Sequence, residues 1–158
     1  MNAVDYLILG TDIGGLAFAD VILSESDATI AFIQGHESDK IAARLASRGR
    51  TCDTIGLNTY TLSDWCKNFP SRADTCTTST SLQAYCDHVL ENRFLPESRV
   101  QLLQSVEHLG HGKLRSLIDG RVHALEVRRK IVNAGALSAP TCASFIPSYT
   151  VTPGVDLV

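Results

Sequence analysis

The sequence predicts an α/β fold in a single domain over residues 1–158, with a three-layer parallel sheet and an antiparallel β-meander. Three observations predict this class. An apolar run at 4–9 leads through a glycine turn into an apolar helix, and a second apolar run at 28–33 completes a β-α-β unit. Alternating or turn-bounded segments then fill residues 104–128, as is typical of a meander.

The first third of the chain supplies the β-α-β unit. Residues 4–9 are apolar almost throughout, as expected for a strand that is covered on both faces. A helical stripe runs from Ile13 to about Leu23, and the polar residues 24–27 end the helix. Residues 28–33 form the next strand, and the crossover between the two strands should be right-handed.

Residues 38–77 are the least regular part of the chain, and we interpret them as an insertion or a lid. Trp65 and Phe69 could form a ligand wall there, but their spacing favours a small satellite core.

The rest of the chain predicts a helix followed by strands. The helix begins at Ser81 and stops at Pro96, with His88 on its solvent side. Residues 99–103 predict a third parallel strand and residues 130–134 a return to the central sheet. Between them lie the meander strands, expected at 105–109, 113–118 and 121–127.

Composition and charge exclude several classes of protein. With 44% hydrophobic and 20% charged residues, the chain is typical of one globular domain. No apolar run approaches the roughly 18 residues of a membrane helix and the N-terminus lacks a basic signal region, so we expect a cytoplasmic protein without a membrane partner. Residues 1–40 hold seven acids and one base, which disfavours nucleic acid as a partner.

Two smaller features follow from residue types and spacing. The basic run at 128–130 is predicted to be a solvated strand end. The five cysteines contain no C-x-x-C pair, so we expect free thiols rather than a zinc site or a disulfide framework.

Residues 10–15, Gly-Thr-Asp-Ile-Gly-Gly, nearly match the dinucleotide-binding pattern G-x-G-x-x-G. Gly10 and Gly15 occupy the outer glycine positions, but Asp12 occupies the middle one, where the backbone should approach a pyrophosphate. Two unit charges about 4 Å apart repel by roughly 4 kcal/mol at an effective dielectric constant near 20. Asp12 therefore opposes tight binding of a nucleotide.

The end of the second strand departs from the same pattern. A dinucleotide site usually presents Asp or Glu there to the ribose hydroxyls, whereas this strand runs into Gln34. Gln34 could bind a ribose as a neutral group. Glu37 is a displaced candidate, although a solvated loop acid is the simpler interpretation.

No other catalytic or metal-binding constellation is evident. Ser63 and Ser81 lack a G-x-S-x-G context, and the five histidines show no zinc spacing. His108 and His111 could bind a metal together with Glu107, but turn histidines at the surface are the preferred interpretation, and we predict no metal.

These features together resemble the N-terminal FAD-binding region of two-dinucleotide-binding-domain flavoproteins, the flavin monooxygenase-like FAD/NAD(P)-binding oxidoreductases. The resemblance covers most of residues 3–155 and depends on the motif at 5–17, the strand at 28–33, the meander turn at 119–120 and the segment 131–135. It implies a Rossmann-like fold and an FAD whose pyrophosphate lies over Gly10, Thr11, Ile13, Gly14 and Gly15, with Gln34 or Glu37 near the ribose. The chain departs from it at Asp12 and Gln34, and it stops before the substrate-binding portion of that family.

Two hypotheses about function follow. In the first, this is an FAD-dependent oxidoreductase or monooxygenase-like domain, incomplete or completed by a partner subunit. In the second, it is a degenerate, cofactor-free Rossmann-like domain that binds a small-molecule ligand or a protein, or acts as a non-redox catalyst. A single-domain NAD dehydrogenase is less favoured because no Tyr-x-x-x-Lys pair is present. If the domain lacks its second half, the apolar surface that this half would cover predicts a homo-oligomer or a partner subunit.

Overall fold

The computed structural model describes residues 3–34, 55–69 and 79–134. Its centre is a four-stranded sheet in which every neighbouring pair is parallel, as predicted. In spatial order the strands are β5 (Val100–Leu103), β2 (Ile30–Ile33), β1 (Ala3–Leu9) and β9 (Glu126–Asn133).

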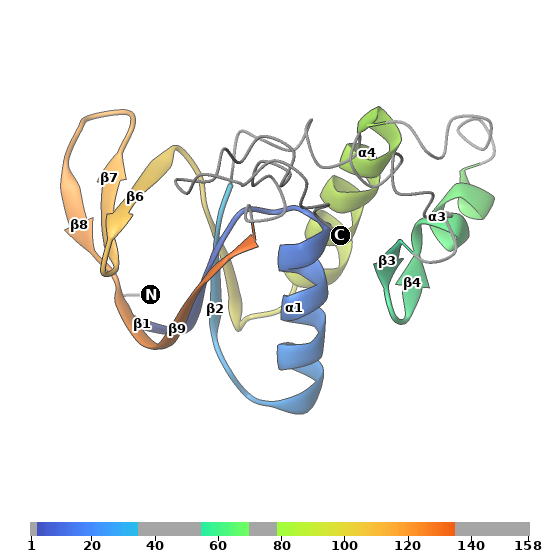
Figure 1. The fold of residues 1–158 in the computed structure, drawn as a ribbon, viewed down its shortest axis with the longest axis horizontal. Coiled ribbons are helices and arrows are strands. Elements are labelled where there is room, and N and C mark those ends of the chain that lie inside the picture. The colour runs from blue at the N-terminus through green and yellow to red at the C-terminus, as the bar shows by residue number, and fades with distance from the viewer. Residues whose placement is uncertain (1–2, 35–54, 70–78, 135–158) are drawn as a thin grey trace, which may run out of the picture.

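Two different layers cover the two faces of this sheet (Figure 1). One layer contains the helices α1 (Ile13–Glu25) and α4 (Ser79–Val89), with α4 continuing into the π-helical turn η3 (Leu90–Phe94). The other is the antiparallel meander of β6 (Val106–Gly110), β7 (Lys113–Ser116) and β8 (Val122–Ala124). The predicted three-layer α/β fold is therefore confirmed.

Alternating side chains of the central strands build the two cores. Ile8 and Phe32 are fully buried in the cluster formed with the helices, whereas Leu7 and Ala31 are fully buried in the cluster beneath the meander. Because both faces are covered, these strands are apolar almost without interruption.

A β-bulge near the start of β1 changes which layer its side chains face. The N–H groups of Asp5 and Tyr6 both donate to the carbonyl oxygen of Thr29, at 3.0 and 3.1 Å. Val4 therefore packs beneath the meander, while Tyr6, two residues later, packs on the helix side.

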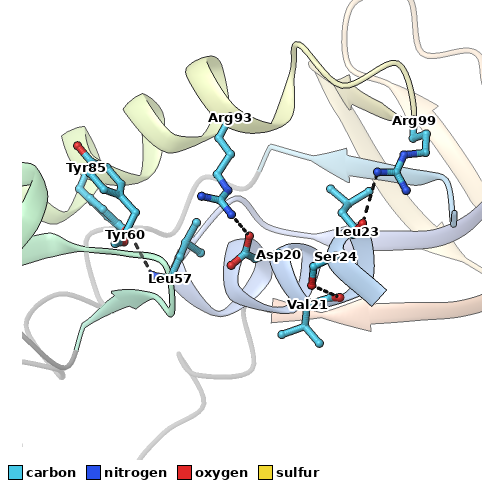
Figure 2. Close-up of polar contacts among 9 residues, drawn as sticks. All are labelled: Asp20, Val21, Leu23, Ser24, Leu57, Tyr60, Tyr85, Arg93 and Arg99. Atoms are coloured by element: carbon cyan, nitrogen blue, oxygen red, sulfur yellow. Dashed lines mark hydrogen bonds and ion pairs between the residues drawn. The ribbon is translucent and has the colours of Figure 1, made fainter. Parts of the chain in front are cut away.

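Two arginines attach α1 to the segment that follows α4 (Figure 2). Arg93 pairs with Asp20 at 2.6 Å, and Arg99 donates to the carbonyl oxygens of Leu23 and Ser26 at 3.4 and 2.7 Å. Those carbonyls lie at the C-terminal end of α1, where the helix itself supplies no donors.

The meander is shorter than the predicted 104–128. Its last strand ends at Ala124, and Glu126 already begins β9, so residues 126–128 belong to the parallel sheet. The buried Leu125 makes the corner, and its N–H donates to Gly112 O at 2.9 Å. The basic run at 128–130 is exposed, as predicted, but it lies in the middle of the edge strand rather than at a strand end.

The described part of the predicted insertion is a hairpin followed by a short helix. The hairpin joins β3 (Gly56–Leu57) to β4 (Tyr60–Thr61), and α3 (Leu62–Asn68) follows directly. Thr61 and Asp64 form a capping box that starts α3. Residues 38–54 and 70–77 of the insertion lie outside the described residues.

Tyr85 of α4 holds the hairpin against the helix layer. Its hydroxyl accepts a hydrogen bond from Leu57 N–H at 3.0 Å and donates to Tyr60 O at 2.5 Å (Figure 2). Trp65 is buried beside the Tyr85 ring and belongs to the main core, so the expected satellite core is wrong for this residue.

Two other expectations from the sequence are wrong, one because of packing and one because of a disulfide. His88 is half-buried against the rings of Phe69 and Tyr60, at 5.4 and 6.4 Å between centroids, rather than on the solvent side. Cys66 is disulfide-bonded, so the expectation of free thiols is wrong there, whereas Cys86 is free and buried. The absence of a C-x-x-C pair excluded only pairings close in sequence.

Asp5 gives a pH-dependent prediction for the stability of the fold. Its Oδ2 accepts hydrogen bonds from the N–H and hydroxyl of Thr29 at 2.8 and 3.0 Å, and Oδ1 lies 3.7 Å from Arg129 Nε. The Thr29 backbone hydrogen bond is the main reason why the pKa of Asp5 is below its usual range. Stability from a carboxyl with a depressed pKa is present above its unfolded pKa and lost as the pH falls through its folded pKa.

We therefore expect Asp5→Asn to lower the free energy of unfolding by about 1 kcal/mol at neutral pH. The difference from the unsubstituted protein should shrink below about pH 4, where the Asp5 carboxyl of the unfolded chain begins to take up a proton. Urea unfolding of both proteins across a pH series would measure this difference in the free energy of unfolding. A difference that stays constant down to the acid limit would contradict an electrostatic origin.

Candidate functional site

The glycine turn lies at the carboxyl end of β1, where it leads into α1. Gly10 has φ +112°, a conformation that favours glycine, and its N–H donates to Ile33 O at 2.9 Å. This hydrogen bond joins the turn to the end of β2. The turn is therefore placed at the sheet edge where open α/β folds bind their ligands.

Gly15 allows α1 to approach the sheet closely. A Cβ at this position would lie 2.8 Å from Gly10 O and 3.1 Å from side-chain atoms of Ile8 and Ala134. The outer glycines of the pattern thus have the structural roles that the motif requires.

The side chain of Asp12 caps the N-terminal end of α1. It is the N-cap residue of α1, and its Oδ1 accepts a hydrogen bond from Gly15 N–H at 3.0 Å. Its φ of −79° is ordinary for any residue, so the backbone here does not require glycine. A carboxylate oxygen therefore already uses a helix N–H of the kind that binds phosphate.

Burial sets the protonation behaviour of Asp12, which is only 9% exposed. Loss of solvation raises the pKa of its carboxyl, and the N–H groups of Gly15 and Gly14 act in the opposite direction. Cys86 of α4 is buried nearby; burial, with the charge of Asp12 as a smaller cause, strongly raises the pKa of its thiol. This thiol is protonated at neutral pH and is not an activated nucleophile.

All but one of the other predicted site residues lie at this edge of the sheet. Thr11 and Gly14 are half-buried and Ile13 is buried in the turn. Gln34 is exposed and follows β2, whose last residue pairs with the last residue of β1. Glu37 lies outside the described residues.

Sequence reasoning missed the capping role of Asp12, although a signal for it was present. Aspartate is among the preferred N-cap residues, and it stands directly before the apolar helix. Considering Asp12 only as an altered glycine concealed this second role.

In the part of the chain that the structure describes, no three His, Cys, Asp or Glu side chains gather in a way that could hold a metal ion. No described helix is both long enough and apolar enough to cross a membrane.

The fold and the site define an α/β domain with a glycine turn at the carboxyl edge of a parallel sheet. The chain is 32% identical over 165 aligned positions to uncharacterized proteins of Mycobacterium bovis and of two strains of Mycobacterium tuberculosis. Each alignment covers 98% of this chain but 30% of the relative, so the chain spans less than a third of the length of these proteins. No family model and no solved structure matches the chain.

Proposed function

We propose that this chain is a cofactor-free domain of the dinucleotide-binding type, which acts by binding a small molecule or another protein. The observation that carries the proposal is the buried carboxylate of Asp12, bonded to Gly15 N–H at 3.0 Å. A pyrophosphate over the turn would have to displace this carboxylate or approach it closely.

The electrostatic cost of such an approach is large. Roughly 4 kcal/mol for two charges about 4 Å apart corresponds to a factor of about a thousand in a dissociation constant. The residues at the turn therefore do not fit a nucleotide pyrophosphate while Asp12 keeps this position and its charge. For that reason we derive no flavin chemistry from the site.

Titration of the purified protein with FAD and with ADP tests this proposal. We expect a protein without flavin absorbance bands after desalting, and no saturable binding of either ligand by calorimetry. Flavin bands that persist through desalting would overturn the cofactor-free proposal.

An FAD-dependent oxidoreductase-like domain is the second candidate, and the topology favours it. A three-stranded meander inserted between the parallel strands β5 and β9 is the order of elements on which the flavoprotein resemblance depends. In this case FAD would lie over Gly10, Thr11, Ile13, Gly14 and Gly15, with Gln34 near the ribose. Asp12 would have to turn away from the helix end.

The cytoplasmic location stays a prediction. The disulfide at Cys66 argues against it, because disulfides are rare in reducing compartments.

A further inference from the structure

Helix α1 is apolar on nearly all sides, although only part of its surface packs on the sheet. Leu16 and Ala19 are completely buried against the core. On a different side, Gly14, Phe18 and Val21 follow one another at i, i+4 and i+7, so they share one face. Phe18 is half-buried and Val21 is 41% exposed. A helix that is hydrophobic all round is normally covered all round.

The strip of sheet beside this helix face is also open. In the sheet register Tyr6 pairs with Lys130 and Ile8 with Val132, which places all four side chains on the helix side of the sheet. The rings of Tyr6 and Phe18 meet edge to face at 5.6 Å. Lys130 is exposed and Val132 is half-buried, because β9 is the edge strand. We call this surface the α1–β9 face; its residues are Tyr6, Phe18, Val21, Lys130 and Val132.

The border of the α1–β9 face is basic. Arg128, Arg129 and Lys130 are consecutive and exposed on β9. Arg129 lies 5.8 Å from the centre of the Tyr6 ring and 3.7 Å from the carboxylate of Asp5. Arg128 and Lys130 form no ion pair within the described residues. The face thus combines an apolar surface with two exposed cations, neither of which is in an ion pair among the described residues.

The cations of this face favour one of two candidate binding partners over the other. A second copy of the chain, related by a two-fold axis that passes through the basic border, would bring the same cations towards each other, which is unfavourable. A segment that carries Asp or Glu beside an apolar stripe would instead complement both features.

The length of the relatives favours a protein segment as the occupant. The matched region is 30% of each mycobacterial protein, so 100 − 30 = 70% of each consists of further polypeptide. In those proteins, a domain of this kind is joined to more than twice its own length of chain.

We propose that the α1–β9 face binds an amphipathic helix of polypeptide outside residues 1–158, of the kind that the relatives carry in the rest of their length. The apolar side of that helix packs on Phe18, Val21 and Val132, and its flanking Asp or Glu side chains pair with Arg128 and Lys130. The inference rests on the proposed function in assigning a protein-binding role. Its test does not involve the nucleotide position, so the two proposals can fail separately.

Two synthetic peptides of equal length test this proposal on the whole chain. Both are helical with a leucine stripe; one has Glu beside the stripe, and the other has Lys at the same positions. We expect the Glu peptide to bind about five- to tenfold more tightly in fluorescence anisotropy, with an advantage that decreases as salt is added.

Surface variants locate the binding. Val21→Asp should lower the affinity for the Glu peptide by about tenfold or more, because it puts a charge under the apolar stripe of the peptide. Arg128→Glu together with Lys130→Glu should reverse the preference, so that the Lys peptide binds more tightly. Arg121→Glu is the matched control: its side chain is 78% exposed on the meander, and binding should not change. Circular dichroism and urea unfolding of each variant establish that it is folded.

Three outcomes would overturn the proposal. The first is that neither peptide binds the unsubstituted chain. The second is that both peptides bind it equally and that Val21→Asp does not change their affinity. Alternatively, light scattering shows a dimer that Val21→Asp converts to a monomer, which would assign the face to a second copy.

Discussion

Asp12→Gly is expected to raise the affinity for ADP by at least about tenfold, which corresponds to about 1.4 kcal/mol of binding free energy. The substitution removes a buried negative charge and frees the N–H of Gly15 for a phosphate oxygen. The Coulomb estimate of roughly 4 kcal/mol is an upper limit, because Asp12 can also rotate away or take up a proton. Titration calorimetry with ADP measures the effect without requiring a flavin.

Asp12→Asn separates the two ways in which the carboxylate blocks the site. Asparagine keeps an oxygen that can accept from Gly15 N–H, but it carries no charge. If charge is the obstacle, both variants should bind ADP; if occupation of the N–H is the obstacle, only Asp12→Gly should. Glycine at an N-cap costs only a few tenths of a kcal/mol, so both variants should fold. If neither substitution tightens binding, the turn is not a latent pyrophosphate site.

Gly56→Ala is expected to lower the free energy of unfolding by about 3 kcal/mol, from the sum of two effects. Gly56 has φ +133°, a region that alanine rarely adopts. An added Cβ would also lie 2.8 Å from Thr61 Cα and from the Tyr85 hydroxyl, and 2.9 Å from Leu62 N. Two of these contacts are with the backbone of β4 and of the start of α3, so relief requires the hairpin itself to distort as well as to move away from Tyr85.

Gly110→Ala is the matched control for backbone strain alone. Gly110 also has a positive φ, +103°, but a Cβ there would meet nothing within 4 Å. We expect this substitution to cost about 1 kcal/mol, well below the effect at Gly56. Thermal and urea unfolding of the two variants would compare them. Equal losses would mean that the close contacts around Gly56 contribute nothing.

The effect at Gly56 also extends to the candidate site. The β3 strand packs against α1, and Leu57 joins the same core cluster as Ile13 and Leu16. Displacing the hairpin therefore loosens the helix whose first turn holds Asp12.

Local patterns predicted those parts of the fold whose geometry depends on neighbours in sequence. The strands β1 and β2, the helix α1 between them and the turn at Gly10 follow from apolar periodicity and from the need for a positive φ. The helix expected between Ser81 and Pro96 appears as α4 and η3 for the same reason. The candidate site lies on these elements, so its position could be predicted.

Other features depended on contacts between distant residues. His88 has a helical position that suits solvent, yet rings from β4 and from the end of α3 cover it. The end of the meander was misplaced because the start of β9 is decided by pairing with β1, more than a hundred residues earlier. Such pairings leave little trace in a local window of sequence.

The sequence by itself determined the α/β class, the order of the elements and the position of the glycine turn, because each depends on local periodicity and on glycine conformation. Only the tertiary structure decided that Asp12 bonds to Gly15 N–H and that Val21 and Lys130 border one open face. Side-chain direction and exposure depend on what the rest of the chain packs against each residue, and a one-dimensional pattern does not contain that information.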